Sequence, residues 1–281
     1  LFRKTPQGAT SHPRSHERDK MSVRVAPPSA ARGGGAIHTE RYQALKRELE
    51  EFCEKGPQHD AATPLHHAAE EGDIPAIRAL LRIGARVDER DSEGQTPLMV
   101  AASWGQPDAI RALVEGGADT SLQDEGGDTA LHEAARADEV LSLLALLELG
   151  ADKDPRNKLG ATPLHLASHL SNGAACKALI RGGAAVTGAK SLMKGGYSPL
   201  HAAAANGSTE CLQDLLAAGS SLKHSASESS LRGGSATALE LAEESGQRHA
   251  ASVLRNASVS EFEKHGMWGK PENDGGSSSG G

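Results

Sequence analysis

The sequence predicts an all-α solenoid in which short pairs of helices stack along one axis. A tetrapeptide that reads Thr-Pro-Leu-His at residues 63–66 recurs with variations, and its copies begin at residues 63, 96, 129, 162, 198 and 237. A Gly-Ala pair follows the first four copies at a constant distance, at residues 84, 117, 150 and 183. Such a period indicates supersecondary units that bury a core only by stacking. Aromatic residues are only 2% of the chain, which favours close-packed helices of leucine and alanine over a β-sandwich.

The second copy shows how local rules build one unit. Thr96 can cap a helix with its hydroxyl group, and Pro97 suits the first helical position because no N–H is needed there. Gly105 ends this first helix. A second helix, with apolar residues at helical spacing, then runs toward Gly116 and Gly117. Neither helix can enclose a core alone, so the unit depends on its neighbours.

The motif Gly-x-Thr-Pro-Leu-His-x-Ala-Ala, followed by Leu-Leu-x-x-Gly-Ala, resembles the ankyrin repeat. The resemblance covers about residues 57–257 and implies an ankyrin-repeat domain of about six units joined by short hairpin turns. Their approximate bounds are 58–90, 91–123, 124–156, 157–189, 190–224 and 225–257. The last unit has Glu240 where a histidine is usual, and it carries polar residues where an internal repeat packs. We therefore expect this degenerate unit to cap the C-terminal end.

The helix expected before the first repeat, within residues 38–56, has an apolar face. Its members are Tyr42, Leu45, Leu49, Phe52 and Cys53. Charged residues occupy the rest of the helix, so it should cover the exposed end of the stack. The alternative is a helix that binds a partner or pairs with a second copy.

Two terminal segments and two insertions lie outside the regular pattern. Residues 1–37 and 258–281 lack a periodic apolar face, and we expect a disordered leader and a disordered Gly/Ser-rich tail. The chain starts at Leu1, and Met21 is a candidate translational start. Extra residues near 190–196 and 225–234 fall in turns between repeats, which project as fingers in the ankyrin family.

The charge is unevenly distributed. The net charge is −7 for the whole chain, but residues 1–37 hold seven Lys and Arg against two acidic residues, a net of +5, which leaves −12 for the remainder. An acidic array argues against nucleic-acid binding, which needs cations to neutralise phosphates. It favours a basic or mixed protein partner, and the alternative is a solvated surface without a binding role.

The cysteines indicate a reducing compartment. Cys53, Cys176 and Cys211 are an odd, sparse set that gives neither a disulfide framework nor a zinc site. No apolar run approaches the ~20 residues of a membrane span. We expect an intracellular protein, cytoplasmic in the first instance, with the nucleus or an organelle as alternatives.

The histidines have a structural interpretation. His66, His132, His165 and His201 all occupy the fourth position of the tetrapeptide. They resemble the ankyrin histidine that bonds to the backbone and to the Thr or Ser of its own motif. No spacing typical of a metal site or a catalytic group is left over. We expect no catalytic residues, no metal and no cofactor.

The resemblance also implies which residues contact a partner. In ankyrin arrays, contacts come from the turn before Thr-Pro and from the two residues before the glycine that ends the first helix. The positions that match are Glu70, Glu71, Glu93, Gln95, Ser103, Trp104, Asp128, Arg136, His169, Leu170, Tyr197 and Asn206. Trp104 is the most informative, because tryptophan is enriched among interface hot spots. The alternative is that Trp104 packs between adjacent first helices.

Repeats three and four depart from the pattern at the end of the first helix. Asp138 and Ser171 replace the glycine there, and repeat four is expected to be looser or differently turned. This expectation bears most on His169 and Leu170, which immediately precede Ser171.

The function predicted from these features is a non-catalytic protein–protein interaction module. It would be an adaptor or scaffold, monomeric, that presents a concave surface and its turns to a protein partner. The alternative is a targeting or regulatory region of a larger enzyme or complex whose catalytic part lies outside this chain.

Overall fold

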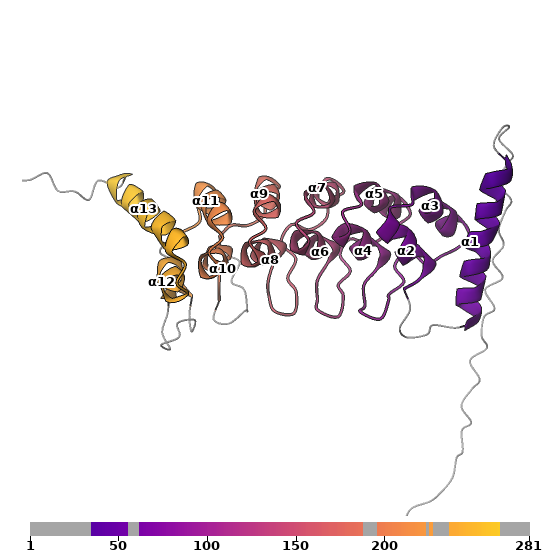
Figure 1. Cartoon of the computed structure of the whole chain (residues 1–281), viewed down its shortest axis with the longest axis horizontal. Coiled ribbons are helices and arrows are strands. Elements are labelled where there is room, and N and C mark those ends of the chain that lie inside the picture. The colour runs from indigo at the N-terminus through magenta and orange to yellow at the C-terminus, as the bar shows by residue number, and fades with distance from the viewer. Residues whose placement is uncertain (1–34, 56–61, 188–195, 223–224, 227–235, 265–281) are drawn as a thin grey trace, which may run out of the picture.

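The computed structural model describes residues 35–55, 62–187, 196–222, 225–226 and 236–264 (Figure 1). The helices of the first layer are α2 Pro64–Glu71, α4 Pro97–Ser103, α6 Ala130–Arg136, α8 Pro163–Leu170, α10 Pro199–Asn206 and α12 Ala238–Glu244. The helices of the second layer are α3 Ile74–Arg82, α5 Pro107–Glu115, α7 Val140–Glu148, α9 Gly173–Arg181, α11 Thr209–Ala217 and α13 Arg248–Lys264. Each helix packs on its pair mate and on the same helix of the next repeat. The all-α solenoid is thereby confirmed.

Each first helix begins at its tetrapeptide for the expected local reasons. Thr96 adopts an extended backbone with φ −96° and ψ 160°, and its hydroxyl oxygen accepts a hydrogen bond from the Met99 N–H. Proline follows at the first helical position. In the last repeat the Glu240 carboxylate takes the place of histidine and accepts a 2.7 Å hydrogen bond from the Thr237 N–H.

The first helices of repeats three and four end in the same left-handed backbone as the others, so the expectation of a differently turned repeat four is wrong. Asp138 has φ +60° and Ser171 has φ +64°. Short polar side chains tolerate this conformation when a hydrogen bond holds them. The Asp138 carboxylate accepts a 2.8 Å bond from the Ala175 N–H, and the Ser171 and Ser208 hydroxyls are hydrogen-bonded to each other.

The core runs without a break through the stack. Small residues allow the first helices to approach closely, and Ala69, Ala102 and Ala135 are fully buried. Leucine and isoleucine of the second helices fill the remaining space, as Leu80 and Leu113 do. No helix within the described residues is both long and apolar enough to cross a membrane.

Helix α1, Gly35–Lys55, lies across the N-terminal end of the stack (Figure 1). It contacts α3 and, less extensively, α2. Tyr42, Leu45 and Leu49 are partly buried against the core, and Arg41 forms an ion pair with Asp73. An open groove remains between α1 and α2. A capping role for α1 stays a prediction.

Some expected segments are bounded differently or lie outside the described residues. Helix α13 continues to Lys264 rather than ending at 257, because no glycine or proline interrupts it before Gly266. Strands β1 Ser225–Ala226 and β2 Ala236–Thr237 pair antiparallel, and β1 lies within the second expected insertion. The described residues leave out 188–195 and 227–235, which include most of the two expected insertions, and the termini 1–34 and 265–281.

Candidate functional site

The candidate site is one continuous surface on the first-helix layer. We call it the inner surface, and it comprises the first-helix ends 70–71, 103–104, 136–137, 169–170 and 205–206 together with the turns 88–95, 121–128, 154–161 and 196–197. The turns of successive repeats project on the same side of the array (Figure 1). The inner surface is therefore built from equivalent positions of stacked units, and stacking fixes its geometry.

Buried histidines tie the first helices of repeats one, three and four to the repeat that follows each of them. The Nδ1 atom of His132 accepts a 3.1 Å hydrogen bond from the Thr129 N–H, which leaves the proton on Nε2. Nε2 then donates to the Ala161 carbonyl at 3.0 Å. His66 and His165 make the equivalent bonds, to the Gln95 and Tyr197 carbonyls at 3.0 and 3.1 Å. Burial lowers the pKa of both His66 and His132 below the ordinary 6.5, which favours the neutral ring that this pattern needs.

Polar side chains then join the first-helix ends to one another. The Gln106 amide donates to the Glu70 carbonyl at 3.1 Å, from repeat two to repeat one. The Asn172 amide donates to the Ala135 carbonyl at 2.9 Å. The Asn206 amide nitrogen lies 2.7 Å from the His169 Nδ1. These bonds hold the first-helix ends in fixed positions, which reduces the entropy lost when a partner binds.

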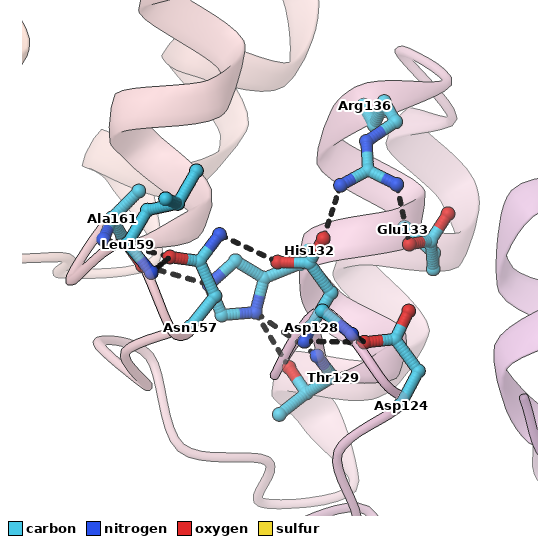
Figure 2. A network of polar contacts seen from close by, with 10 residues as sticks. Asp124, Asp128, Thr129, His132, Glu133, Arg136, Asn157, Leu159 and Ala161 are labelled. Atoms are coloured by element: carbon cyan, nitrogen blue, oxygen red, sulfur yellow. Dashed lines mark hydrogen bonds and ion pairs between the residues drawn. The ribbon is translucent and has the colours of Figure 1, made fainter. Parts of the chain in front are cut away.

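A cluster of charged side chains surrounds Arg136 on the inner surface (Figure 2). The guanidinium donates a 2.8 Å hydrogen bond to the Glu133 carboxylate and forms an ion pair with Asp128. The Asn157 amide, from the next repeat, donates to the other Asp128 oxygen at 2.8 Å. The carboxylates of Asp128 and Glu133 are almost fully buried, whereas the Arg136 side chain is 44% exposed. The two buried carboxylates thus hold the half-exposed Arg136 side chain in place.

Electrostatics explains why this arrangement needs its arginine. Burial raises the pKa of Glu133 above its ordinary value, and the positive charge of Arg136 opposes that rise. Burial lowers the pKa of Arg136, but Glu133 and Asp128 outweigh this effect and raise it. Carboxylate oxygens of Asp124, Asp128 and Glu133 lie within 4.8 Å of one another. The guanidinium already compensates the charge of Asp128 and Glu133, so we assign the cluster to the positioning of Arg136.

A family model for ankyrin repeats matches four overlapping windows of the sequence, at residues 35–124, 65–157, 116–189 and 131–226. The chain belongs to the ankyrin repeat family. Ankyrin repeats generally act as protein–protein interaction modules, and the family is typically non-catalytic. No curated protein sequence matches this ankyrin-repeat protein significantly.

The ankyrin array places most of the predicted contact residues where a partner could reach them. The exposed ones are Glu71, Glu93, Trp104, Arg136, His169, Leu170 and Asn206. The half-buried ones are Glu70, Gln95, Ser103 and Tyr197. Trp104 is 58% exposed, so it does not pack between adjacent first helices. Whether these residues contact a partner remains a prediction.

Asp128 is placed differently from the expectation. It is only 5% exposed, and both of its carboxylate oxygens have partners. The reason is the turn that precedes it, in which the Asp124 carboxylate accepts a 2.8 Å bond from the Asp128 N–H and folds the chain inward. Asp128 therefore positions Arg136 and is not available for direct contact.

Sequence reasoning missed Glu133 and Asn157. Glu133 occupies a buried position that Val100 and Leu166 fill in the adjacent repeats. A carboxylate in an apolar row, three residues before Arg136, was a signal for an ion pair on one helix face. Asn157 carried no such signal, because its amide bonds to Asp128 across 29 residues.

The stabilising role of the buried histidines can be tested with a substitution that repeat two already contains. Met99 stands there in place of histidine. His132→Met should reduce the free energy of unfolding by about 1–2 kcal/mol at pH 7.5, because the bond to the Ala161 carbonyl is lost. The folded pKa of His132 is lowered, so the unfolded chain binds the proton first as the pH falls below 6.5, and wild-type stability is lost there. Urea unfolding should therefore show a smaller difference at pH 5; an equal difference at both pH values would contradict the neutral-ring assignment.

Proposed function

We propose that this ankyrin array is a non-catalytic adaptor or scaffold that binds a protein partner on its inner surface and turns. The observation that carries the proposal is Trp104, whose side chain is 58% exposed at the C-terminal end of α4. Nothing in the stacking requires a tryptophan there, because the equivalent positions hold Glu71, Ala137, Leu170 and Asn206. An exposed tryptophan on a rigid surface suits the role of an interface anchor.

Leu170 supports the same proposal. It occupies the position of Trp104 two repeats later and is 46% exposed. Arg136 lies in the repeat between them, next to the equivalent position at Ala137, and its side chain is 44% exposed and held by two buried carboxylates. Tryptophan and arginine are residue types over-represented at binding hot spots, and a preorganised arginine loses little entropy on contact.

Trp104→Ala should weaken partner binding by about 2 kcal/mol, or roughly 30-fold in Kd, and leave stability within about 0.5 kcal/mol of wild type. The partner is first captured by the full chain, and its affinity is then measured by calorimetry. The matched control is Leu141→Ala, because Leu141 is 65% exposed on the outer helix α7. Equal losses of affinity in the two variants, or a lowered melting temperature for Trp104→Ala alone, would remove the basis for the proposal.

We also propose that the protein acts as a monomer inside the cell, without nucleic-acid binding, most simply in the cytoplasm. Cys176 and Cys211 are free and buried, which suits a reducing compartment. The acidic charge of the array supports a protein partner over a nucleic acid. The same inner surface would serve if the array targets or regulates a larger enzyme or complex.

A further inference from the structure

The inner surface changes in chemical character along the array, and this change bears on the kind of partner it fits. The inference rests on the proposed function, because it specifies the partner of the same surface. Repeats one to three carry its carboxylates, and repeat four carries its exposed leucines.

The carboxylates line both the first-helix ends and the turns. Glu71 is exposed at the end of α2, next to half-buried Glu70. Glu93 and Glu125 are exposed in the turns of repeats two and three. The Glu125 N–H donates to the Glu93 carbonyl at 3.5 Å, so the two turns lie side by side. Their negative charges therefore add over one stretch of surface.

Two arginines of this stretch are already engaged. Arg136 is surrounded by the carboxylates of Asp128 and Glu133, with Asp124 beside them. Arg90 donates through one nitrogen to the Gly94 and Gln123 carbonyls, at 2.8 and 2.6 Å. Acidic residues of the inner surface in repeats one to three outnumber its arginines, which are Arg90, Arg136 and the exposed Arg156. The stretch therefore keeps a negative potential that a cationic partner would neutralise.

Trp104 lies within the acidic stretch. The Gln106 amide, two residues beyond Trp104, bonds to the Glu70 carbonyl and keeps the end of α4 beside the end of α2. An indole face attracts a lysine or arginine side chain, and neighbouring carboxylates strengthen that attraction. The Trp104 side chain can thus receive the aliphatic stem of a long cationic side chain whose head group meets Glu70 or Glu71.

The character of the surface changes at repeat four. The turn there presents Lys158 and Leu159, and Leu159 is 56% exposed. The Lys158 N–H donates to the Gly126 carbonyl at 3.0 Å, which seats this turn directly beside the acidic turn of repeat three. Leu170, at the end of α8, adds a second exposed leucine. Apolar contact replaces charge at this end.

We propose that the inner surface binds a short linear segment of a partner protein that is rich in lysine and arginine and carries apolar residues at one end. The cationic side chains lie over repeats one to three, between Trp104 and the carboxylates of Glu71, Glu93 and Glu125. The apolar side chains lie over repeat four, against Leu159 and Leu170. Charge fixes the direction of the segment, because reversing it would place cations beside Lys158.

The test selects binders from a phage library of random linear peptides on the full-length protein. Selected peptides should be enriched in lysine and arginine relative to the unselected library. The triple variant Glu71→Gln, Glu93→Gln, Glu125→Gln should weaken their binding about tenfold, since each exposed ion pair contributes modestly. The matched control is Glu115→Gln, Glu148→Gln, Glu210→Gln, which removes the same charge from exposed sites on the outer helices. It should change binding by less than about twofold.

The outcomes separate this inference from the proposed function. Selected peptides that are neutral or acidic, yet lose affinity to Trp104→Ala, would overturn the basic segment and leave the inner surface as the binding site. Selected peptides whose affinity is unchanged by Trp104→Ala would contradict both the basic segment and the inner surface as the binding site. Equal weakening by the two triple variants would mean that overall charge acts rather than this surface. Failure to select any peptide would overturn the linear segment, while the captured partner still tests the proposed function.

Discussion

Removal of helix α1 is expected to destabilise the first repeat by about 3–5 kcal/mol, the largest effect on stability that the structure implies. Tyr42, Leu45 and Leu49 are partly buried against the core, and each contributes roughly 1 kcal/mol, less than the ~1.5–3 kcal/mol of a fully buried side chain. Without them, Ile77 and Leu80 would approach water at the open end of the stack, although both are fully buried in the intact protein. Nearest-neighbour coupling should then carry the damage into repeat two.

Hydrogen exchange on a chain lacking residues 1–55 measures this effect repeat by repeat. Amide protection in α2 and α3 should fall about 100-fold or more, while α8 to α11 change little. In the full chain, Leu45→Ala should reproduce part of the loss, and the exposed Glu48→Ala on the same helix should not. Unchanged protection in α3 would mean that α1 is not a cap, and the helix that binds a partner or a second copy would become the better interpretation.

Arg136→Ala is expected to be the most destabilising substitution on the inner surface, at about 2–3 kcal/mol. It leaves two buried carboxylates, Asp128 and Glu133, without their guanidinium. Breaking a buried ion pair costs about 3–5 kcal/mol, and the half-exposed arginine places this case below that range. Arg111 is the matched control, because it is also 44% exposed and also faces two carboxylates, Asp108 and Glu148. Those two are exposed, so Arg111→Ala should cost no more than about 1 kcal/mol.

The loss caused by Arg136→Ala should also depend on pH. Burial raises the pKa of Glu133, so the folded protein holds a proton that the unfolded chain has released, and stability falls as the pH rises above the ordinary 4.5. The positive charge of Arg136 opposes that rise in the pKa of Glu133. Its removal therefore raises the pKa further and extends the loss of stability toward neutral pH. Urea unfolding should therefore show a larger gap between variant and wild type at pH 7 than at pH 4.5. Equal gaps, or equal losses for Arg136→Ala and Arg111→Ala, would contradict the role given to the buried carboxylates.

The repeat period allowed most of the local structure to be predicted. A threonine or serine N-cap, in most repeats followed by proline, set the starts of the first helices, and glycine set most of their ends. The position of Trp104 in this period predicted a surface residue, and the structure leaves it 58% exposed. These features depend on neighbours along the chain, which is why the spacing of residues was enough to find them.

The spacing of residues did not predict the contacts between repeats, and only the tertiary structure decided them. Asp128 looked like a contact residue from its place before Thr129, yet Asn157 of the next repeat and Arg136 hold it buried. Asp138 and Ser171 looked like irregular helix ends, yet partners about one repeat away hold both in the left-handed backbone. The sequence by itself determined where each unit begins, ends and presents its variable residues, because short-range sterics and capping act within one unit. Which of those residues remain free was decided by stacking, because a side chain's burial and charge depend on the repeat placed against it.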